Sequence, residues 1–327
     1  MENTPAFIPH FEDAERQQCK ASIMIEGLSG KGKTGAALGI AHILVGGDWS
    51  KIAGIDTENK SMPLFVGLNN TFGDTFGHFK ISHLTPDIGY KPTHYIYLRD
   101  YAVNNLGIEA VVKDSISHAW TYKGGVLDLV NQAKNKSSHY AKDNYAAWGD
   151  PEVYQEKNEL LQLIRDSRVH VITTVRVKEK FDYDTNGEKT VLKSLGEQQI
   201  QQADLKYEPD LVLHMIKPGK YKNNNIQHPI AKVIKSRYAI FDEDEEYELT
   251  PELIQQLKEY LEDGVDPNEI MEKQRQDYIE QVKLHLRNHQ SQQAIWKTIK
   301  KDAGYEETKL DDLPLEVIKS LYIKLNS

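Results

Sequence analysis

The residues best suited to chemistry form a glycine-rich run near the N-terminus, Gly27-Leu28-Ser29-Gly30-Lys31-Gly32-Lys33-Thr34. Its spacing is G-x-x-x-x-G-K-[ST], in which the glycines let backbone N–H groups turn inward around phosphate oxygens. A helix that begins near Lys33 would direct the positive end of its dipole at the same phosphates. The pattern therefore predicts an ATP-binding loop made by Gly27, Ser29, Gly30, Lys31, Gly32, Lys33, Thr34 and Gly35.

Two side chains of this loop have distinct expected roles. Lys33 supplies a point charge to the β- and γ-phosphates, and the Thr34 hydroxyl is an expected ligand for Mg²⁺. Lys31 occupies a variable position of the pattern. The alternative is a glycine-rich turn without a ligand, but the run lies between a strand-like and a helix-like stretch, which is the context that a phosphate loop requires.

Two acidic positions complete the expected site. Asp114 ends a strand-like stretch and would hold the water shell of Mg²⁺, so the metal residues are Thr34 and Asp114. The next residue is Ser115, whereas AAA+ proteins usually place a Glu there, so the carboxylate that activates water must come from elsewhere. Glu58, at the end of Ile55-Asp56-Thr57-Glu58, is the candidate, and a solvated acidic turn is the alternative. Beyond Lys33, no second cation is evident in this site.

The elements that position these residues alternate along the chain. Helical periodicity predicts helices over 33–45 and 151–166. Apolar and β-branched runs predict strands over 23–26, 52–56, 95–98, 108–114, 169–176, 211–216 and 231–241. Strands that alternate with helices imply an α/β fold with a mostly parallel sheet covered on both faces. The polar stretch 220–225 predicts a hairpin loop.

The order of these motifs resembles the RecA-like recombinase family. That family has a phosphate loop, a strand ending D-x-E, a strand ending Asp-Ser and a polar-ended strand, which here is Ile172-Thr173-Thr174. The resemblance implies a RecA-like ATPase core in which Glu58 activates water. It also implies that a basic pair on a late strand, Lys235 and Arg237, reaches the nucleotide of a neighbouring subunit. An ordinary exposed strand edge is the alternative for this pair.

More narrowly, the chain resembles phage-encoded RecA-like ATPases of single-strand annealing and recombination. The similarity lies in Asp114-Ser115-Ile116-Ser117-His118-Ala119-Trp120 and in the run from His170 to Lys178. One feature departs from the family, whose recombinases usually have a Gln after the polar-ended strand. Thr174 or Arg176 stands near that place, so the coupling of ATP to DNA is expected to differ.

An irregular segment is expected over 177–210, where the strand–helix pattern lapses and 182–187 has turn chemistry. In the family this position contacts single-stranded DNA, and basic and aromatic side chains suit that contact: Lys178, Lys180, Phe181, Tyr183, Lys189 and Lys193. Acidic neighbours weaken the interpretation, and a solvated loop is the alternative. Trp296 with Lys297, Lys300 and Lys301 offers a second basic and aromatic group, or an amphipathic helix with Trp in its core.

Composition limits the remaining possibilities. The chain has 327 residues, 40 Lys and Arg against 49 Asp and Glu, and a net charge of −9, so it is not built for general nucleic-acid binding. The single cysteine, Cys19, excludes an internal disulfide framework, no apolar run is long enough to span a membrane, and a cytoplasmic protein is expected. We expect an N-terminal extension over 1–20, an ATPase core over 21–249 and a helical domain over 265–327.

These observations lead to one expected function and two alternatives. The expected function is an ATP- and Mg²⁺-dependent ATPase that acts on single-stranded DNA in phage recombination or replication. Its expected partners are copies of itself in a ring or filament, single-stranded DNA, and a single-strand-binding or replication protein. The first alternative is a replicative helicase or a helicase loader. The second is a nucleotide-controlled assembly protein with little turnover.

Overall fold

The computed structural model describes residues 13–136, 145–186, 189–219, 221–222, 225–226 and 228–326, without side chains over 180–196, 221–226 and 326. The chain divides into two compact units. The larger is Lys20–Leu261, and the smaller joins Met1–Cys19 to Glu262–Ser327.

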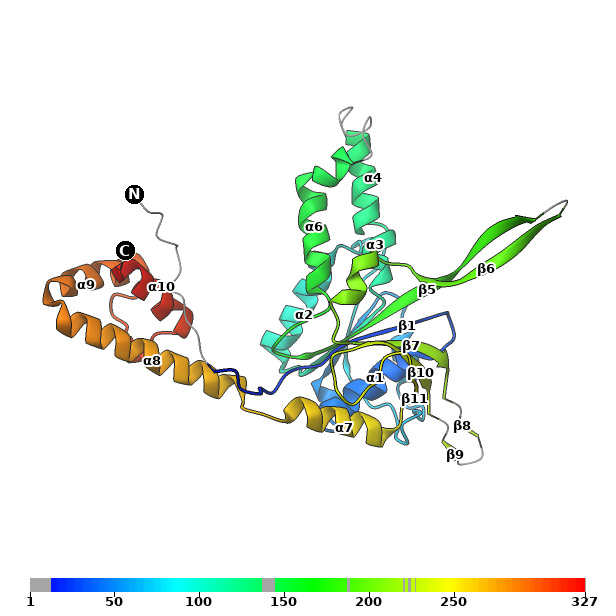
Figure 1. The fold of residues 1–327 in the computed structure, drawn as a ribbon, viewed down its shortest axis with the longest axis horizontal. Helices are drawn as coiled ribbons and strands as arrows, with labels where there is room; N and C mark the ends of the chain where they lie inside the picture. The colour runs from blue at the N-terminus through cyan, green and yellow to red at the C-terminus, as the bar shows by residue number, and fades with distance from the viewer. Residues whose placement is uncertain are drawn as a thin grey trace. The chain divides into compact units, whose positions relative to one another are not determined.

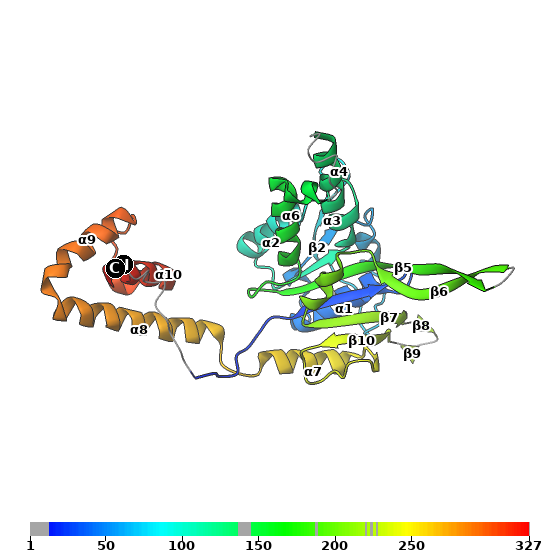
Figure 2. The ribbon, with the colours of Figure 1, turned by 45° about the horizontal axis from the view of Figure 1, so that its top comes forward.

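A nine-stranded sheet forms the centre of the larger unit (Figures 1 and 2). Its strand order is β11-β10-β7-β1-β5-β4-β2-β3, and β6 pairs with β5 outside this path. Neighbouring strands from β7 to β3 run parallel, whereas β10, β11 and β6 pair antiparallel. The strands are β1 (Ser22–Gly27), β2 (Ile52–Asp56), β3 (Lys80–His83), β4 (Ala110–Asp114), β5 (His170–Asn186), β6 (Lys189–Gln199), β7 (Leu211–Lys217), β10 (Ile230–Ser236) and β11 (Glu246–Glu248). This mostly parallel sheet confirms the predicted α/β class.

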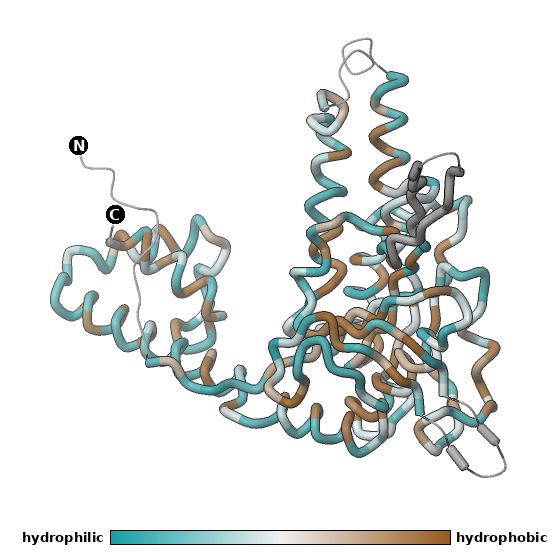
Figure 3. Tube along the Cα trace, turned by 45° about the vertical axis from the view of Figure 1, so that its right-hand side comes forward, coloured by the Kyte–Doolittle hydropathy of each residue, from teal (hydrophilic) through white to brown (hydrophobic). Residues whose placement is uncertain are grey.

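Helices cover both faces of the sheet because its central strands are buried on both sides. Every residue of β1, β2 and β4 is buried, as expected for parallel strands between two helical layers. On one face α1 (Lys33–Leu44) and α7 (Pro251–Glu262) contribute to a single apolar core that includes Ile40 and Leu257. On the other face α2 (Pro92–Leu106) and α6 (Pro151–Gln162) contribute Tyr95 and Leu160. Figure 3 shows the corresponding concentration of hydrophobic residues along the central strands.

The strand predicted over 95–98 is wrong, because these residues lie inside α2. Pro92 occupies its first turn, and Gly107 ends it with a left-handed φ of 65°. Tyr95, Arg99 and Ala102 are buried at spacings of four and three residues, which is helical periodicity. A short aromatic run resembles a strand, but the longer stretch that contains it has the period of a helix.

The irregular segment predicted over 177–210 is also wrong over most of its length. β5 continues to Asn186 and returns as β6, with pairing from Val177↔Gln199 to Asn186↔Lys189. We call residues 177–199 the arm; it projects from the sheet in Figures 1 and 2. The Asn-Gly pair after Asp184-Thr185 is a strong hairpin signal between two strands. The side chains of Lys180, Phe181, Tyr183, Lys189 and Lys193 lie outside the described residues, and Lys178 is exposed.

Several smaller elements connect the strands. The predicted polar hairpin near 220–225 is present as β8 (Tyr221–Lys222) paired antiparallel with β9 (Asn225–Ile226). Short helices follow β4, namely α3 (Ser117–Thr121) and α4 (Val126–Lys136). Two side-chain donors cap the C-terminal end of α6, because Arg99 Nη1 donates to Gln162 O at 2.8 Å and Lys113 Nζ donates to Leu163 O at 2.5 Å.

The smaller unit is helical and has its own core. It contains α8 (Pro267–Asn288), α9 (Gln293–Asp302) and α10 (Leu315–Asn326). Trp296 is buried there with Ile279, Val282, Ile318 and Leu321, so the amphipathic interpretation of the Trp296 region is confirmed. Backbone hydrogen bonds from Gln18 N to Val265 O and from Val265 N to Arg16 O attach the N-terminal segment to this unit. No helix in the described ranges has the length and apolar character needed to cross a bilayer.

Candidate active site

The predicted phosphate loop joins β1 to α1. Gly27, Gly30 and Gly32 all have positive φ, at 147°, 76° and 82°. A Cβ at Gly27 would lie 3.2 Å from Met215 O, and one at Gly32 would lie 3.1 Å from Pro218 Cβ. Gly32 is the N-cap of α1 and provides no side-chain acceptor, so no side chain caps the first N–H groups of the helix. A loop of this form presents backbone donors to an anion.

Both lysines of the loop bind backbone carbonyl groups. Lys33 Nζ donates to Gly27 O at 2.8 Å and to Leu28 O at 2.9 Å, so the ammonium lies across the loop. Burial lowers the pKa of Lys33, although Asp114 and Glu58 act in the opposite direction. Lys31 Nζ donates to Ile216 O at 3.1 Å and thereby attaches the loop to β7.

Asp114 lies at the carboxyl end of β4 between two hydroxyl groups. Thr34 Oγ1 donates to Asp114 Oδ2 at 2.5 Å, and Thr174 Oγ1 donates to Asp114 Oδ1. The side chain is buried, and burial raises the pKa of Asp114 although both hydrogen bonds lower it. A hydroxyl and a carboxylate in contact are the oxygen donors that Mg²⁺ takes alongside phosphate and water. The residues present therefore fit the expected metal.

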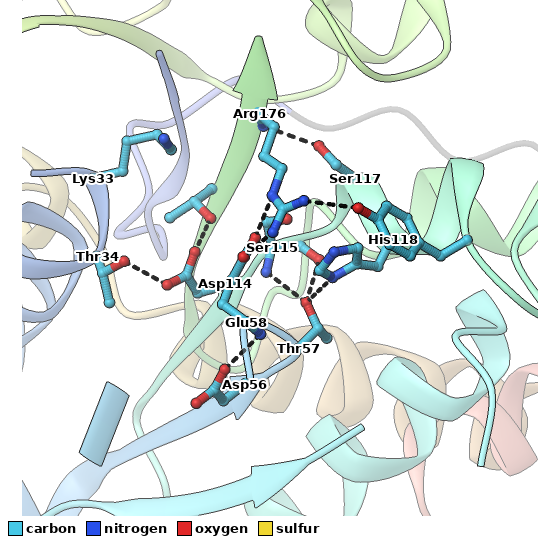
Figure 4. Close-up of polar contacts among 12 residues, drawn as sticks. Lys33, Thr34, Asp56, Thr57, Glu58, Asp114, Ser115, Ser117, His118 and Arg176 are labelled. Atoms are coloured by element: carbon cyan, nitrogen blue, oxygen red, sulfur yellow. Dashed lines mark hydrogen bonds and ion pairs between the residues drawn. The ribbon is translucent and has the colours of Figure 1, made fainter. Parts of the chain in front are cut away.

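Glu58 reaches the same edge of the sheet from the end of β2. Asp56 fixes the turn before it, because Asp56 Oδ1 accepts from Glu58 N at 2.7 Å and Oδ2 accepts from Met62 N at 3.2 Å. The Glu58 carboxylate is bound by the Arg176 guanidinium, with Nε to Oε1 at 2.6 Å and Nη2 to Oε2 (Figure 4). Burial raises the pKa of Glu58, but the effects that lower it, led by Arg176, together outweigh burial, and the net pKa is lowered.

Arg176, which the sequence did not assign to the site, is the partner of Glu58. It lies on β5 at the root of the arm, and its guanidinium also donates from Nη1 to Tyr122 Oη at 3.0 Å. The expectation that the site has no cation beyond Lys33 is therefore wrong. The departure from the usual Gln was a signal in the sequence, but only the pairing of strands brings Arg176 to Glu58.

A buried hydroxyl joins the Glu58 turn to the Asp114 loop. Thr57 Oγ1 accepts from Ser115 N at 2.8 Å and donates to Ser115 O at 3.1 Å, and His118 Nδ1 lies 2.5 Å from the same oxygen (Figure 4). Burial lowers the pKa of His118 to about 4, so the imidazole is neutral at pH 7. This network joins the ends of β2 and β4, a role for Thr57 and His118 that the sequence did not reveal.

Within one chain, the predicted basic pair lies at the opposite end of the strands from the phosphate loop. Ser236, between the two residues, pairs with Leu211 at the start of β7, whereas the phosphate loop lies near the end of β7. Lys235 Nζ donates to Tyr207 O at 2.5 Å and to Pro209 O at 2.6 Å, and Arg237 Nη1 donates to Asp210 Oδ1 at 2.9 Å. The two side chains therefore do not reach the nucleotide site of their own chain. A contact with a neighbouring subunit stays a prediction.

Comparisons with known proteins place this chain in a family. A family model described as an AAA domain matches residues 19–248. No curated protein matches the sequence. Among solved structures, a KaiC-like protein, PH0186, from the hyperthermophilic archaeon Pyrococcus horikoshii OT3 is 14% identical with a TM-score of 0.37, over 69% of this chain and 83% of that one. Because the family model matches well over half of the sequence, and includes every residue of the site described above, the chain belongs to the AAA domain family.

Proposed function

We propose that this protein is an Mg²⁺-dependent ATPase whose water-activating residue is Glu58. The observation that supports it most is the meeting of Lys33, Thr34, Asp114 and Glu58 at the carboxyl ends of three parallel strands. Ligands of open α/β sheets bind at this edge. Membership of the AAA domain family supports nucleotide hydrolysis.

Each side chain has a definite role in this proposal. The N–H groups of the loop and Lys33 bind the phosphates, while Thr34 and Asp114 would hold Mg²⁺ and its water shell. Mg²⁺, when bound, would supply positive charge that stabilises the charge developing on the phosphates. Thr174 keeps Asp114 oriented by its hydrogen bond. Glu58 orients a water for attack on the γ-phosphorus and accepts its proton.

We further propose that the ATPase acts on single-stranded DNA in recombination or replication, as the resemblance to phage RecA-like ATPases implies. The arm supports this assignment, because it projects from the site and carries an exposed Lys178 near its base. A net charge of −9 restricts such binding to a local surface.

Assembly into a ring or filament belongs to the same proposal. Lys235 and Arg237 lie remote from their own phosphate loop, so a role at a nucleotide would require the site of another subunit. A second copy would bring them to its nucleotide. A single-strand-binding or replication protein is the further partner that this role would involve.

One observation favours a second candidate, a nucleotide-controlled assembly protein with little turnover. Both carboxylate oxygens of Glu58 are bound by Arg176, so the residue proposed to activate water is already paired. A protein that binds ATP tightly and hydrolyses it slowly would have this arrangement permanently.

The two candidates differ in a single set of measurements, the ATPase rate and the assembly state with and without single-stranded DNA. The proposal predicts turnover that rises when an oligonucleotide is added, together with larger assemblies. Tight ATP binding with assembly but negligible turnover would favour the second candidate. Unwinding of a forked duplex would instead identify a helicase.

A further inference from the structure

The Arg176–Glu58 ion pair joins two elements that are far apart in sequence. Glu58 follows β2, whereas Arg176 lies on β5, and the pair is partly buried with side-chain exposures of 34% for Arg176 and 20% for Glu58. Both carboxylate oxygens are engaged, the fork-to-fork form that gives strong, directional pairing. The proposed water-activating carboxylate is therefore held by a cation from the same chain.

Hydrogen bonds fix the backbone of Arg176, whereas its side chain is partly exposed. Arg176 N donates to Ser117 Oγ at 2.9 Å, and Arg176 O accepts from Ile200 N at 2.8 Å. The guanidinium carbon lies 5.8 Å from the centre of the Tyr122 ring, which faces it on one side. Rotation about side-chain bonds is thus the available motion, since the arm root anchors the main chain on both strands.

The guanidinium also lies within electrostatic range of the phosphate-binding lysine. Burial is the main cause of the lowered pKa of Lys33, and the positive charge of Arg176 acts in the same direction. Figure 4 shows Lys33 and Arg176 on the same side of the strand ends that carry Asp114 and Glu58. A γ-phosphate held by Lys33 would bring more negative charge to this place than one carboxylate does.

We propose that Arg176 is a catalytic cation supplied by the same chain. When ATP binds, its guanidinium breaks the ion pair with Glu58 and binds the γ-phosphate instead. This inference rests on the proposed ATPase function and adds to it the residue that neutralises the transferred group. The exchange has two consequences. The Arg176 guanidinium donates hydrogen bonds to oxygens of the γ-phosphate. Both carboxylate oxygens of Glu58 then become available to accept from the attacking water.

The reaction then balances without another reactant. Water attacks the γ-phosphorus while the bond from that phosphorus to the bridging oxygen breaks, and the bridging electrons remain on ADP. The proton of the water passes to Glu58 and then to solvent, which leaves inorganic phosphate. Arg176 stabilises the charge that develops on the equatorial oxygens in the transition state. Such an interaction is stronger in a site that excludes water than in bulk water.

Nucleotide discrimination tests the contact directly. Binding of ADP and of adenylyl imidodiphosphate, each with Mg²⁺, would be measured for wild type, Arg176→Ala, Arg176→Gln and Arg176→Lys. We expect the analogue to bind about 10- to 100-fold more weakly to the Ala and Gln variants, the range for a lost charge-assisted hydrogen bond. ADP binding should change by less than about twofold, because ADP lacks the γ-phosphate.

Turnover provides the second readout. Without Arg176, kcat should fall about 10³-fold, the lower end for an arginine at the γ-phosphate, and free guanidinium should restore part of it to Arg176→Ala. Arg168→Ala is the matched control, because that arginine is exposed and pairs with Asp100 and Asp166 before β5. Unchanged or increased kcat in Arg176→Ala, or equal weakening of ADP and the analogue, would overturn the inference.

The exchange itself is tested with Glu58→Gln. An amide binds a guanidinium less strongly than a carboxylate does, so this variant should bind the analogue more tightly than wild type, and the gain should vanish in Arg176→Ala/Glu58→Gln. A gain that persists in the double variant would refute the exchange even if Arg176→Ala alone unfolds. Wild-type protein that neither binds nor hydrolyses ATP would instead refute the proposed ATPase function. Loss of turnover in Lys33→Ala with normal turnover in Arg176→Ala would refute this inference alone.

Discussion

At the scale of single residues, the site combines side chains with opposite demands. Lys33 is partly buried against backbone carbonyls, and burial lowers its pKa. Asp114 is buried between two hydroxyl groups, and burial raises its pKa. A nucleotide with Mg²⁺ would bring negative charge to Lys33 and positive charge to Asp114. Binding of the nucleotide is expected to stabilise the folded chain by mass action.

Replacing Lys33 with Ala removes the ammonium from the phosphate loop. We expect ATP affinity to fall by about 10- to 100-fold, because a charge-assisted hydrogen bond to phosphate is lost, and hydrolysis to become undetectable. Titration of ATP binding and phosphate release measure the two effects. Lys80→Ala, at an exposed position of β3, is the control. Normal hydrolysis by Lys33→Ala would rule out this loop as the ATP site.

The two carboxylates should separate by their effects. Glu58→Gln cannot accept a proton from water, so kcat should fall by roughly 10²- to 10⁴-fold while ATP binds no more weakly. Asp114→Asn loses charge beside Thr34, so the Mg²⁺ concentration needed for ATP binding should rise about tenfold or more. Single-turnover kinetics over a Mg²⁺ titration distinguish them. If Glu58→Gln hydrolyses ATP normally, another residue activates the water.

His170 should make the folded chain sensitive to acid. It is buried at the start of β5, where Nδ1 accepts from Ala21 N at 3.0 Å, and burial lowers its pKa to about 3. Between that value and the unfolded value near 6.5, only the unfolded chain takes up the proton, so stability falls as pH falls. Between pH 7 and pH 5, the free energy of unfolding should fall by about 2 kcal/mol less in His170→Gln than in wild type. Urea unfolding at both pH values measures this, and equal losses would contradict it.

At the scale of elements, the sequence predicted correctly those helices and strands whose residues follow a simple hydrophobic pattern. β2 was placed correctly from an apolar run, and α1 from its helical spacing and loop. The sequence failed at α2, where an aromatic run within a longer helix looked like a strand. It also failed at the arm, where frequent charged residues disguised the alternation on which strand prediction depends. The Arg176–Glu58 pair depends on that pairing, so it was not predictable either.

Deletion of the arm tests its role as an element. Replacing 180–196 with Asn-Gly would close a two-residue turn next to the Glu179↔Glu197 pair and leave Arg176 in place. Gln199 would still donate to Glu26, which precedes the phosphate loop. We expect basal ATPase activity within about twofold of wild type, and loss of stimulation by single-stranded DNA. Full stimulation of the shortened protein would show that DNA does not act through the arm.

At the scale of the whole molecule, the chain contains a sheet-centred unit and a helical unit, each with its own apolar core. The first carries all the residues of the candidate site. Within that unit, the edge that holds the phosphate loop and the edge that holds Lys235 and Arg237 are opposite ends of the parallel strands. Two copies that meet through these edges would complete each other's sites, so activity is expected to depend on assembly.

Mixing two inactive variants tests this dependence. Arg237→Ala should bind ATP nearly normally, since Arg237 contacts Asp210 rather than its own phosphate loop, yet it should lose hydrolysis if it acts on a neighbour. Glu58→Gln should be inactive for a different reason. In a mixed assembly, some interfaces pair an intact Glu58 with an intact Arg237, and those interfaces should recover activity. Phosphate release from the mixture should therefore exceed that of either variant alone. Co-assembly without recovery, or full activity from a monomeric preparation, would show that Arg237 has no role across subunits, because neither result is compatible with a site completed by its neighbour.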